Sequence, residues 1–200
     1  MTHTGTGGRA LKAKGLETRR RLLDAAERVF GEFGFYDASI VKITEAAGVA
    51  QGTFYLYFAS KQVIFEELVR DLNARVRHAM QEGAAQGSDR IEAERLGFRA
   101  YFQFTAEHPA LYRVIRQAEF VSPETLRYHY EKITEGYVEG LREAMRRGEI
   151  ADGDAEVLAW ALMAAGEMLG MRWLLWNGHG EMPADVLSEL DHLLVRMLAP

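Results

Sequence analysis

Residues 39–61 read SIVKITEAAGVAQGTFYLYFASK, and this stretch decides how the first part of the chain folds. The spacing of its apolar residues predicts two short helices separated by a tight turn at Gly48, because glycine adopts positive φ without steric strain. The second helix is expected to span residues 51–58. Two short helices joined in this way form a helix-turn-helix, the motif that places its second helix in the major groove of DNA.

A helical wheel separates the second helix into a buried face and an exposed face. Phe54 and Phe58 point inward together, and Leu56 points away from the core. The flanks carry Gln51, Thr53, Tyr55 and Tyr57. Amides and phenols can hydrogen-bond base edges or phosphates, and a leucine can contact a thymine methyl group. The alternative is an ordinary helical hairpin with half-buried aromatic residues, and periodicity alone fits it equally well.

Residues 46–61, AAGVAQGTFYLYFASK, resemble the signature of the TetR family of bacterial transcriptional repressors. The signature is a small residue pair, Gly-Val, a polar residue, Gly-Thr, an aromatic residue or leucine, Tyr, any residue, Tyr or His, Phe, and a lysine three residues on. The resemblance covers the first quarter to third of the chain. Ala50 stands where many members have a serine that could cap the helix, and Thr44 stands where alanine is common.

The resemblance implies roles for individual residues in binding a double-stranded DNA operator. We expect base contacts from Gln51, Tyr55 and Leu56, with Gly52 allowing the backbone to approach closely. The residues expected to contact phosphates are Ser39, Lys42, Thr53, Tyr57 and Lys61. Because one such helix covers only a few base pairs, two subunits related by a two-fold axis would be needed to read a palindrome.

Charge is distributed unevenly along this chain of 200 residues, whose net charge is −5. The first 21 residues carry one acid, Glu17, and six cations: Arg9, Lys12, Lys14, Arg19, Arg20 and Arg21. A basic arm that leads into a helix-turn-helix is suited to DNA phosphates, and an acidic remainder disfavours non-specific binding. The alternative is a disordered tail that only improves solubility. The chain has no cysteine and no apolar signal-peptide core, so we expect it in the cytoplasm.

Helical periodicity continues through the rest of the chain, which predicts an all-α fold. A first helix is expected over about 17–33, ending at Gly34, and a long fourth helix is expected to begin at Ser60. Further helices are expected at about 91–106, after Pro109, from Pro123 to Gly148, at 157–176 and from about 183. We divide the chain into a helix-turn-helix DNA-binding domain with its basic arm (1–61) and a helical-bundle domain for ligand binding and dimerisation (62–200).

The helix at 157–176 is long and apolar enough to cross a bilayer. Glu167 and Arg172 lie within it and would each cost several kcal/mol in lipid, so no membrane association is expected. An apolar soluble helix must instead be covered on several sides. The family resemblance implies that the last two helices pair with those of a second subunit, and Gly166 and Gly170 would allow two such helices to approach closely.

The larger domain is rich in aromatic residues and methionine. Most of these side chains are expected to be ordinary core, but together they could line a cavity for an apolar or amphipathic small molecule. The ligand-binding candidates are Tyr101, Phe104, Tyr112, Phe120, Tyr130, Tyr137, Trp160, Met163, Glu167 and Met168. Trp173 belongs to the same aromatic group, and the candidate polar partners of the ligand are Glu167, Arg172, Arg116, His129 and Gln117. In the TetR family the effector commonly lies among the corresponding helices. The run GVAQGTFYLYF, together with a long tyrosine-bearing helix that ends in RRGEI, resembles members that respond to fatty acyl compounds.

Enzyme motifs are missing from the sequence. The six histidines show no HExxH or other metal-ligand spacing, and no GxSxG, phosphate-binding loop or dinucleotide fingerprint occurs. No metal or cofactor is therefore expected. The sequence favours a DNA-binding regulator, expected to be a repressor that its ligand releases from DNA. The alternatives are a helical small-molecule-binding adaptor and, less favoured, an enzyme.

Overall fold

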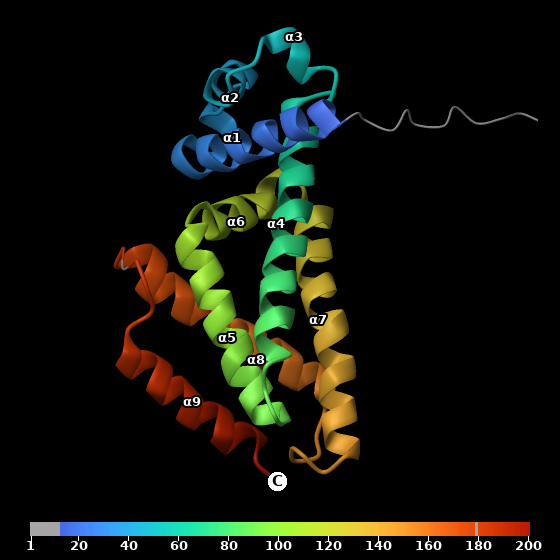
Figure 1. The fold of residues 1–200 in the computed structure, drawn as a ribbon, viewed down its shortest axis with the longest axis vertical. Coiled ribbons are helices and arrows are strands. Elements are labelled where there is room, and N and C mark those ends of the chain that lie inside the picture. Colours follow the sequence, from blue (N-terminus) through green and yellow to red (C-terminus); the bar gives the residue numbers. More distant parts are fainter. Residues whose placement is uncertain (1–12, 179) are drawn as a thin grey trace, which may run out of the picture.

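The computed structural model describes residues 13–178 and 180–200, and in these residues the chain forms helices and no strand, which confirms the all-α fold class. Arg9 and Lys12 of the expected basic arm lie outside the described residues. Figure 1 shows an elongated molecule in which the first three helices form one end.

Helices α1 (Ala13–Asp37), α2 (Ile40–Ala47) and α3 (Gln51–Phe54) make up this end, called the head below. Helix α1 is interrupted at Gly34, whose φ of 76° is outside the helical region, close to where the helix was expected to end. The Ser39 hydroxyl caps α2 by accepting a hydrogen bond from the Lys42 N–H at 3.1 Å. Gly48 ends α2 with a φ of 64°, as the turn requires.

Helix α3 is shorter than the expected span of 51–58. The N–H groups of Leu56 and Tyr57 bond to the carbonyls three residues earlier, Thr53 at 3.2 Å and Phe54 at 2.9 Å. This tightens the chain into 3₁₀-like turns after one α-helical turn. Ala50 supplies no side-chain cap at the start. Phe54 and Phe58 are nevertheless both buried, as the wheel predicted.

Helix α4 (Lys61–Ala84) leaves the head and runs along the molecule beside α7 (Pro123–Arg146), as Figure 1 shows. The Ser60 hydroxyl caps α4 through the Val63 N–H, and Pro123 is the first residue of α7, so both predicted starts are confirmed. Helix α5 (Arg90–Glu107) packs against α4. Helix α6 (Ala110–Val121) starts one residue after Pro109, which occupies the cap position, and it lies across α1.

Helix α8 (Ala155–Gly170) is capped by Asp154, which accepts hydrogen bonds from two backbone N–H groups at 2.9 and 3.1 Å. It continues into a π-helical segment, η1 (Met171–Trp176), and α9 (Ala184–Leu198) ends the chain. The stretch Ala155–Trp176 is long and apolar enough to span a membrane by composition, with a mean hydropathy of 1.2. In the structure α8 packs against α5 and α7, as a helix of a bundle does.

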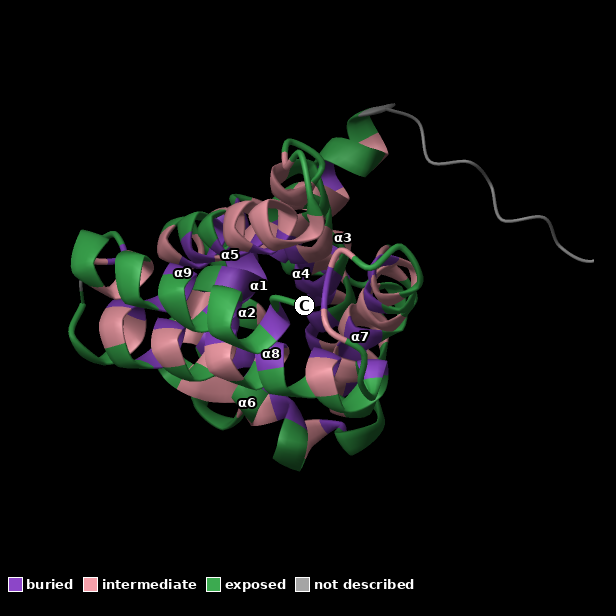
Figure 2. Cartoon of the chain, turned by 90° about the horizontal axis from the view of Figure 1, so that it is seen from below, coloured by how far each residue is buried: buried purple, intermediate pink, exposed green. Residues whose placement is uncertain are grey.

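Two hydrophobic clusters form the interior, and Figure 2 shows buried residues on the inward faces of the helices. The first cluster joins the head to α4 and α6, and includes Phe30, Phe54, Phe65 and Ile115. The second joins α5, α7, α8 and α9. The first cluster crosses residue 61, so the division into 1–61 and 62–200 stays a proposal.

Gly166 and Gly170 do not lie on an open face of α8. Both are buried. A Cβ atom on Gly166 would come within 2.8 Å of the Phe98 ring, and one on Gly170 would collide with the Tyr112 hydroxyl. The two glycines therefore make room for α5 and α6 of the same chain, and the expectation that they bring two subunits together is wrong.

Candidate DNA-binding surface and ligand cavity

The three residues expected to contact bases, together with Gly52, lie on the outer surface of the head. Gln51 and Gly52 are exposed in the first turn of α3. Tyr55 is 54% exposed and Leu56 is 78% exposed in the turns that follow. An exposed leucine and tyrosine cost free energy in water, which a DNA groove would remove by covering them.

The residues expected to contact phosphates differ in how free their polar groups are. Lys42 is exposed, with its ammonium 5.2 Å from the centre of the Phe33 ring. The Ser39 oxygen is occupied as a cap acceptor, but its hydroxyl proton can still be donated. Thr53 and Tyr57 are half-buried, and Tyr57 packs against the first hydrophobic cluster.

Lys61 has an internal role in the structure. Its Nζ donates to the carbonyl oxygens of Phe35 at 2.6 Å, Tyr36 at 3.3 Å and Ala38 at 2.8 Å. It also lies 4.5 Å from the centre of the Phe35 ring. An ammonium group has three protons, so all three are used by the connection between α1 and α2. Binding a phosphate would require Lys61 to give up one of these bonds.

Lys61→Ala should therefore destabilise the protein by about 1–3 kcal/mol, because it leaves these carbonyls without their donor. Urea denaturation followed by circular dichroism measures the change. Lys42→Ala is the matched control, since it removes an exposed lysine, and it should change stability by no more than about 0.5 kcal/mol. Equal stability of the two variants would show that the Lys61 contacts contribute nothing.

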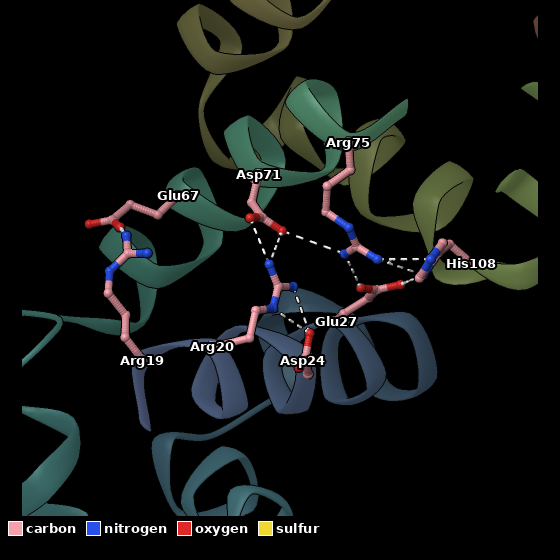
Figure 3. Close-up of polar contacts among 8 residues, drawn as sticks. All are labelled: Arg19, Arg20, Asp24, Glu27, Glu67, Asp71, Arg75 and His108. Atoms are coloured by element: carbon pink, nitrogen blue, oxygen red, sulfur yellow. Dashed lines mark hydrogen bonds and ion pairs between the residues drawn. The ribbon is translucent and has the colours of Figure 1, made fainter. Parts of the chain in front are cut away.

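Two arginines of the basic arm are held in ion pairs with α4, as Figure 3 shows. Arg19 pairs with Glu67. Arg20 binds Asp24 on its own helix at 2.6 Å and Asp71 at 2.8 Å. These acids raise the pKa of Arg20, although burial acts in the opposite direction. Among the described cations of the arm, Lys14 and Arg21 are exposed and remain the better phosphate candidates.

The same polar network continues to the end of α5 (Figure 3). Arg75 binds Asp71 at 3.5 Å and Glu27 at 3.3 Å. His108, the residue that ends α5, lies 2.8 Å from both Arg75 and Glu27. The network thus connects α1, α4 and α5. Sequence analysis missed it because its members are far apart in the chain and no local pattern pairs them.

A narrow cavity, called the apolar cavity below, lies among α4, α5, α6, α7 and α8. Its enclosed volume is only about 50 Å³, which is smaller than that of a typical small-molecule site, so a ligand would have to displace side chains of the wall. The structure brings six of the predicted ligand-binding residues to its wall: Tyr101, Tyr112, Tyr130, Tyr137, Met163 and Glu167. Val76, Met80, Leu111, Ile115, Ile133 and Leu162 add apolar surface that the sequence analysis did not single out.

The other four predicted ligand-binding residues are not in this wall. Phe104 packs in the first hydrophobic cluster against His108, with ring centres 4.5 Å apart. Phe120, Trp160 and Met168 are 75%, 42% and 53% exposed. Their helical positions turn them away from the cavity. Of the polar candidates, His129 lines the cavity, whereas Gln117 binds the head.

The polar groups of the cavity are few and mostly occupied. The Tyr130 hydroxyl donates to both oxygens of Glu167 at 3.1 Å. The Asn73 amide lies 3.2 Å from His129 Nδ1 and donates to the His129 carbonyl at 2.9 Å. Burial lowers the pKa of His129 to about 4, so its ring is neutral at pH 7. Burial also raises the pKa of Tyr112 to about 12.

Helix α6 connects the cavity to the head. Leu111, Tyr112 and Ile115 line the cavity, and the next polar residues reach α1. The Arg113 guanidinium donates to the Gly31 carbonyl at 3.0 Å. The Gln117 side chain accepts from the Phe35 N–H and donates to the Phe30 carbonyl at 3.4 Å. A shift of α6 would therefore move α1.

The last two helices carry exposed apolar side chains at helical spacing. On α8 these form a stripe, called the α8 stripe below, made of Val157, Trp160, Ala161, Ala164 and Met168. On α9 they include Leu193 and Met197, which are 42% and 44% exposed. Exposed apolar patches of this kind mark interaction surfaces.

Comparison with known proteins agrees with this fold. The family model described as bacterial regulatory proteins, tetR family, matches residues 22–68. The fatty acid metabolism regulator protein of Bacillus subtilis (strain 168) is 31% identical over 138 residues, which are 66% of this chain and 71% of that protein. The structure of FadR from Bacillus subtilis in complex with stearoyl-CoA has a TM-score of 0.78 at 24% identity, covering 88% of this chain and 97% of that one.

A further relative extends the match to nearly the whole chain. YdgC, an uncharacterized HTH-type transcriptional regulator of Bacillus subtilis (strain 168), is 33% identical over 195 residues, 95% of this chain and 97% of that protein. The family model covers the helix-turn-helix, and this relative covers the helices behind it as well. This chain therefore belongs to the TetR family of bacterial regulatory proteins.

Proposed function

We propose that this regulator is a cytoplasmic homodimeric repressor that binds a palindromic operator and is released by an apolar or amphipathic small molecule. The observation that carries the proposal is that α6 lines the apolar cavity and also forms a hydrogen bond to α1. A ligand that moves α6 would change the position of the head, and with it the fit to DNA.

On the DNA side, the proposal assigns base contacts to Gln51, Tyr55 and Leu56 and close backbone approach to Gly52. Their exposure on one surface of the head supports it. Two heads are needed for a palindrome, and the exposed apolar residues of α8 and α9 are the proposed dimer surface. In such a dimer the last two helices of each subunit would form a four-helix bundle.

On the ligand side, the apolar wall of the cavity supports an effector with a long apolar part. The names of two similar proteins point the same way. One is a fatty acid metabolism regulator, and the other was solved with stearoyl-CoA. We therefore propose fatty acyl compounds as the first effector class to test.

Selection of DNA from a random pool is expected to enrich a palindrome. Fatty acyl compounds should then release the protein from it, as measured by fluorescence anisotropy of labelled DNA, and native mass spectrometry should detect the bound ligand. Met163→Trp fills the cavity, so this variant should bind operator normally but respond at least about tenfold more weakly to the ligand. The repressor assignment fails if no palindrome is enriched, and the effector assignment fails if no acyl compound releases the DNA.

A further inference from the structure

A second cavity, called the basic cavity below, adjoins the apolar cavity towards the C-terminal end of α4. It lies among α4, α5 and α7 and has about 660 Å³ of unfilled space, counting its opening. Its wall includes Arg77, Arg90 and Lys132. The two cavities share three wall residues, Met80, Ile133 and Tyr137, so only side chains separate them.

A chain of polar contacts crosses this partition. The Tyr137 hydroxyl donates to Glu94, and Glu94 pairs with Arg90. Glu94 is only 3% exposed, and its burial raises its pKa, while Arg90 acts to lower it. Tyr137 faces both cavities, whereas Glu94 and Arg90 line only the basic one. Movement of Tyr137 would therefore open a path between the apolar cavity and the basic cavity.

The Arg90 guanidinium is incompletely paired. Its Nε is buried and has no hydrogen-bond partner among the described residues. A buried donor without an acceptor is costly, so an additional acceptor at this point would be favourable. Gly140 on α7 makes room for the group, because a Cβ atom there would collide with Arg90 Nη1. Arg77 and Lys132 add positive charge to the same wall, although Lys132 also pairs with Glu135, and Glu94 is the only acid among the described residues of this wall.

We propose that the effector has an anionic head group on a long apolar tail, with the tail in the apolar cavity and the head group bound by Arg90, Arg77 and Lys132. This rests on the proposed function, because it assigns the chemistry of the same ligand. The anion competes with Glu94 for Arg90, and Tyr137 moves aside to let the tail pass. The shared chemistry is an anion on an acyl chain, which a free fatty acid or its coenzyme A thioester can supply.

Equilibrium dialysis of the full-length protein with palmitate, hexadecanol and palmitoyl-coenzyme A tests the proposal. Palmitate and hexadecanol have tails of the same length but differ in charge. The wild-type protein should bind palmitate at least about tenfold more tightly than hexadecanol, since a charge-assisted hydrogen bond contributes that much. Comparison with palmitoyl-coenzyme A shows whether a carboxylate or a phosphate is the preferred anion.

Two substitutions should act in opposite directions. Arg90→Gln should weaken palmitate binding about 10- to 100-fold and leave hexadecanol binding unchanged. Glu94→Gln should strengthen palmitate binding, because it removes the competing carboxylate but keeps an acceptor for Tyr137. A purely structural role would weaken binding in both variants. Arg142→Gln is the control, since Arg142 is an exposed arginine on α7 outside both cavities and its replacement changes the net charge equally.

Arg90→Gln leaves Glu94 buried without its partner and could prevent folding. Arg77→Gln and the double variant Arg90→Gln/Glu94→Gln avoid this problem, and both should still lose affinity for palmitate but not for hexadecanol. Equal binding of palmitate and hexadecanol to all variants would overturn the anionic head group and leave the apolar effector standing. If the wild-type protein binds the operator but none of the three probes, both the anionic head group and the apolar effector are overturned.

Discussion

We expect Ala164→Glu to convert the protein into a monomer and to lower its affinity for a palindromic operator by about 10²–10⁴-fold. Ala164 is exposed in the middle of the α8 stripe. A glutamate there would place a charge in the proposed apolar interface and keep the α8 helices of the two subunits apart. The fold of the subunit should survive, because the side chain does not point into its own core. In a dimer, binding of one head holds the second head close to its half-site and raises the operator affinity. Separate monomers lose this gain.

Size-exclusion chromatography with light scattering measures the subunit mass, and fluorescence anisotropy measures operator affinity. Ala85→Glu is the control, because it introduces the same charge at an exposed alanine between α4 and α5. It should leave both measurements unchanged. A dimer that persists in Ala164→Glu would show that the subunits associate through another surface.

Raising the salt concentration from 50 to 200 mM should lower operator affinity by about 10³–10⁵-fold if the dimer neutralises roughly 6–10 phosphates. Four cations of the described head are exposed, Lys14, Arg21, Arg28 and Lys42, so a dimer would present eight. Each neutralised phosphate releases counterions, so the slope of log affinity against log salt counts these contacts.

The same titration can be applied to variants of single cations. Lys42→Ala should reduce the slope by about two, because a dimer carries two copies of the residue. Arg142→Ala, on α7 and outside the head, should leave the slope unchanged. An operator affinity that does not depend on salt would contradict binding through phosphates.

Local features of the fold could be predicted from the sequence because local chemistry determines them. Ser60 caps α4 at the predicted start, and Gly48 supplies the predicted turn. The length of α3 could not be predicted in this way. Over so few residues, the spacing of the apolar side chains fits an α-helix and 3₁₀-like turns equally well. The absence of a side-chain cap at Ala50 concerns the start of the helix and does not indicate where it ends.

Contacts between distant segments were harder to predict. Periodicity shows which face of a helix is apolar but not what covers that face, so Gly166 and Gly170 were assigned to a partner instead of to Phe98 and Tyr112. For the same reason Trp160 was placed in the cavity with Tyr130, although only part of its surface is covered.

The ion-pair network of Figure 3 has a consequence for building chimeric regulators. The head is attached through partners that lie outside the helix-turn-helix, including Asp71 and Arg75 on α4 and His108 at the end of α5. A graft that exchanges only the first 61 residues would leave Asp71, Arg75 and His108 opposite unrelated side chains. Transplanting a new DNA specificity onto this scaffold therefore requires carrying over the matching residues of α4 and α5 with the head.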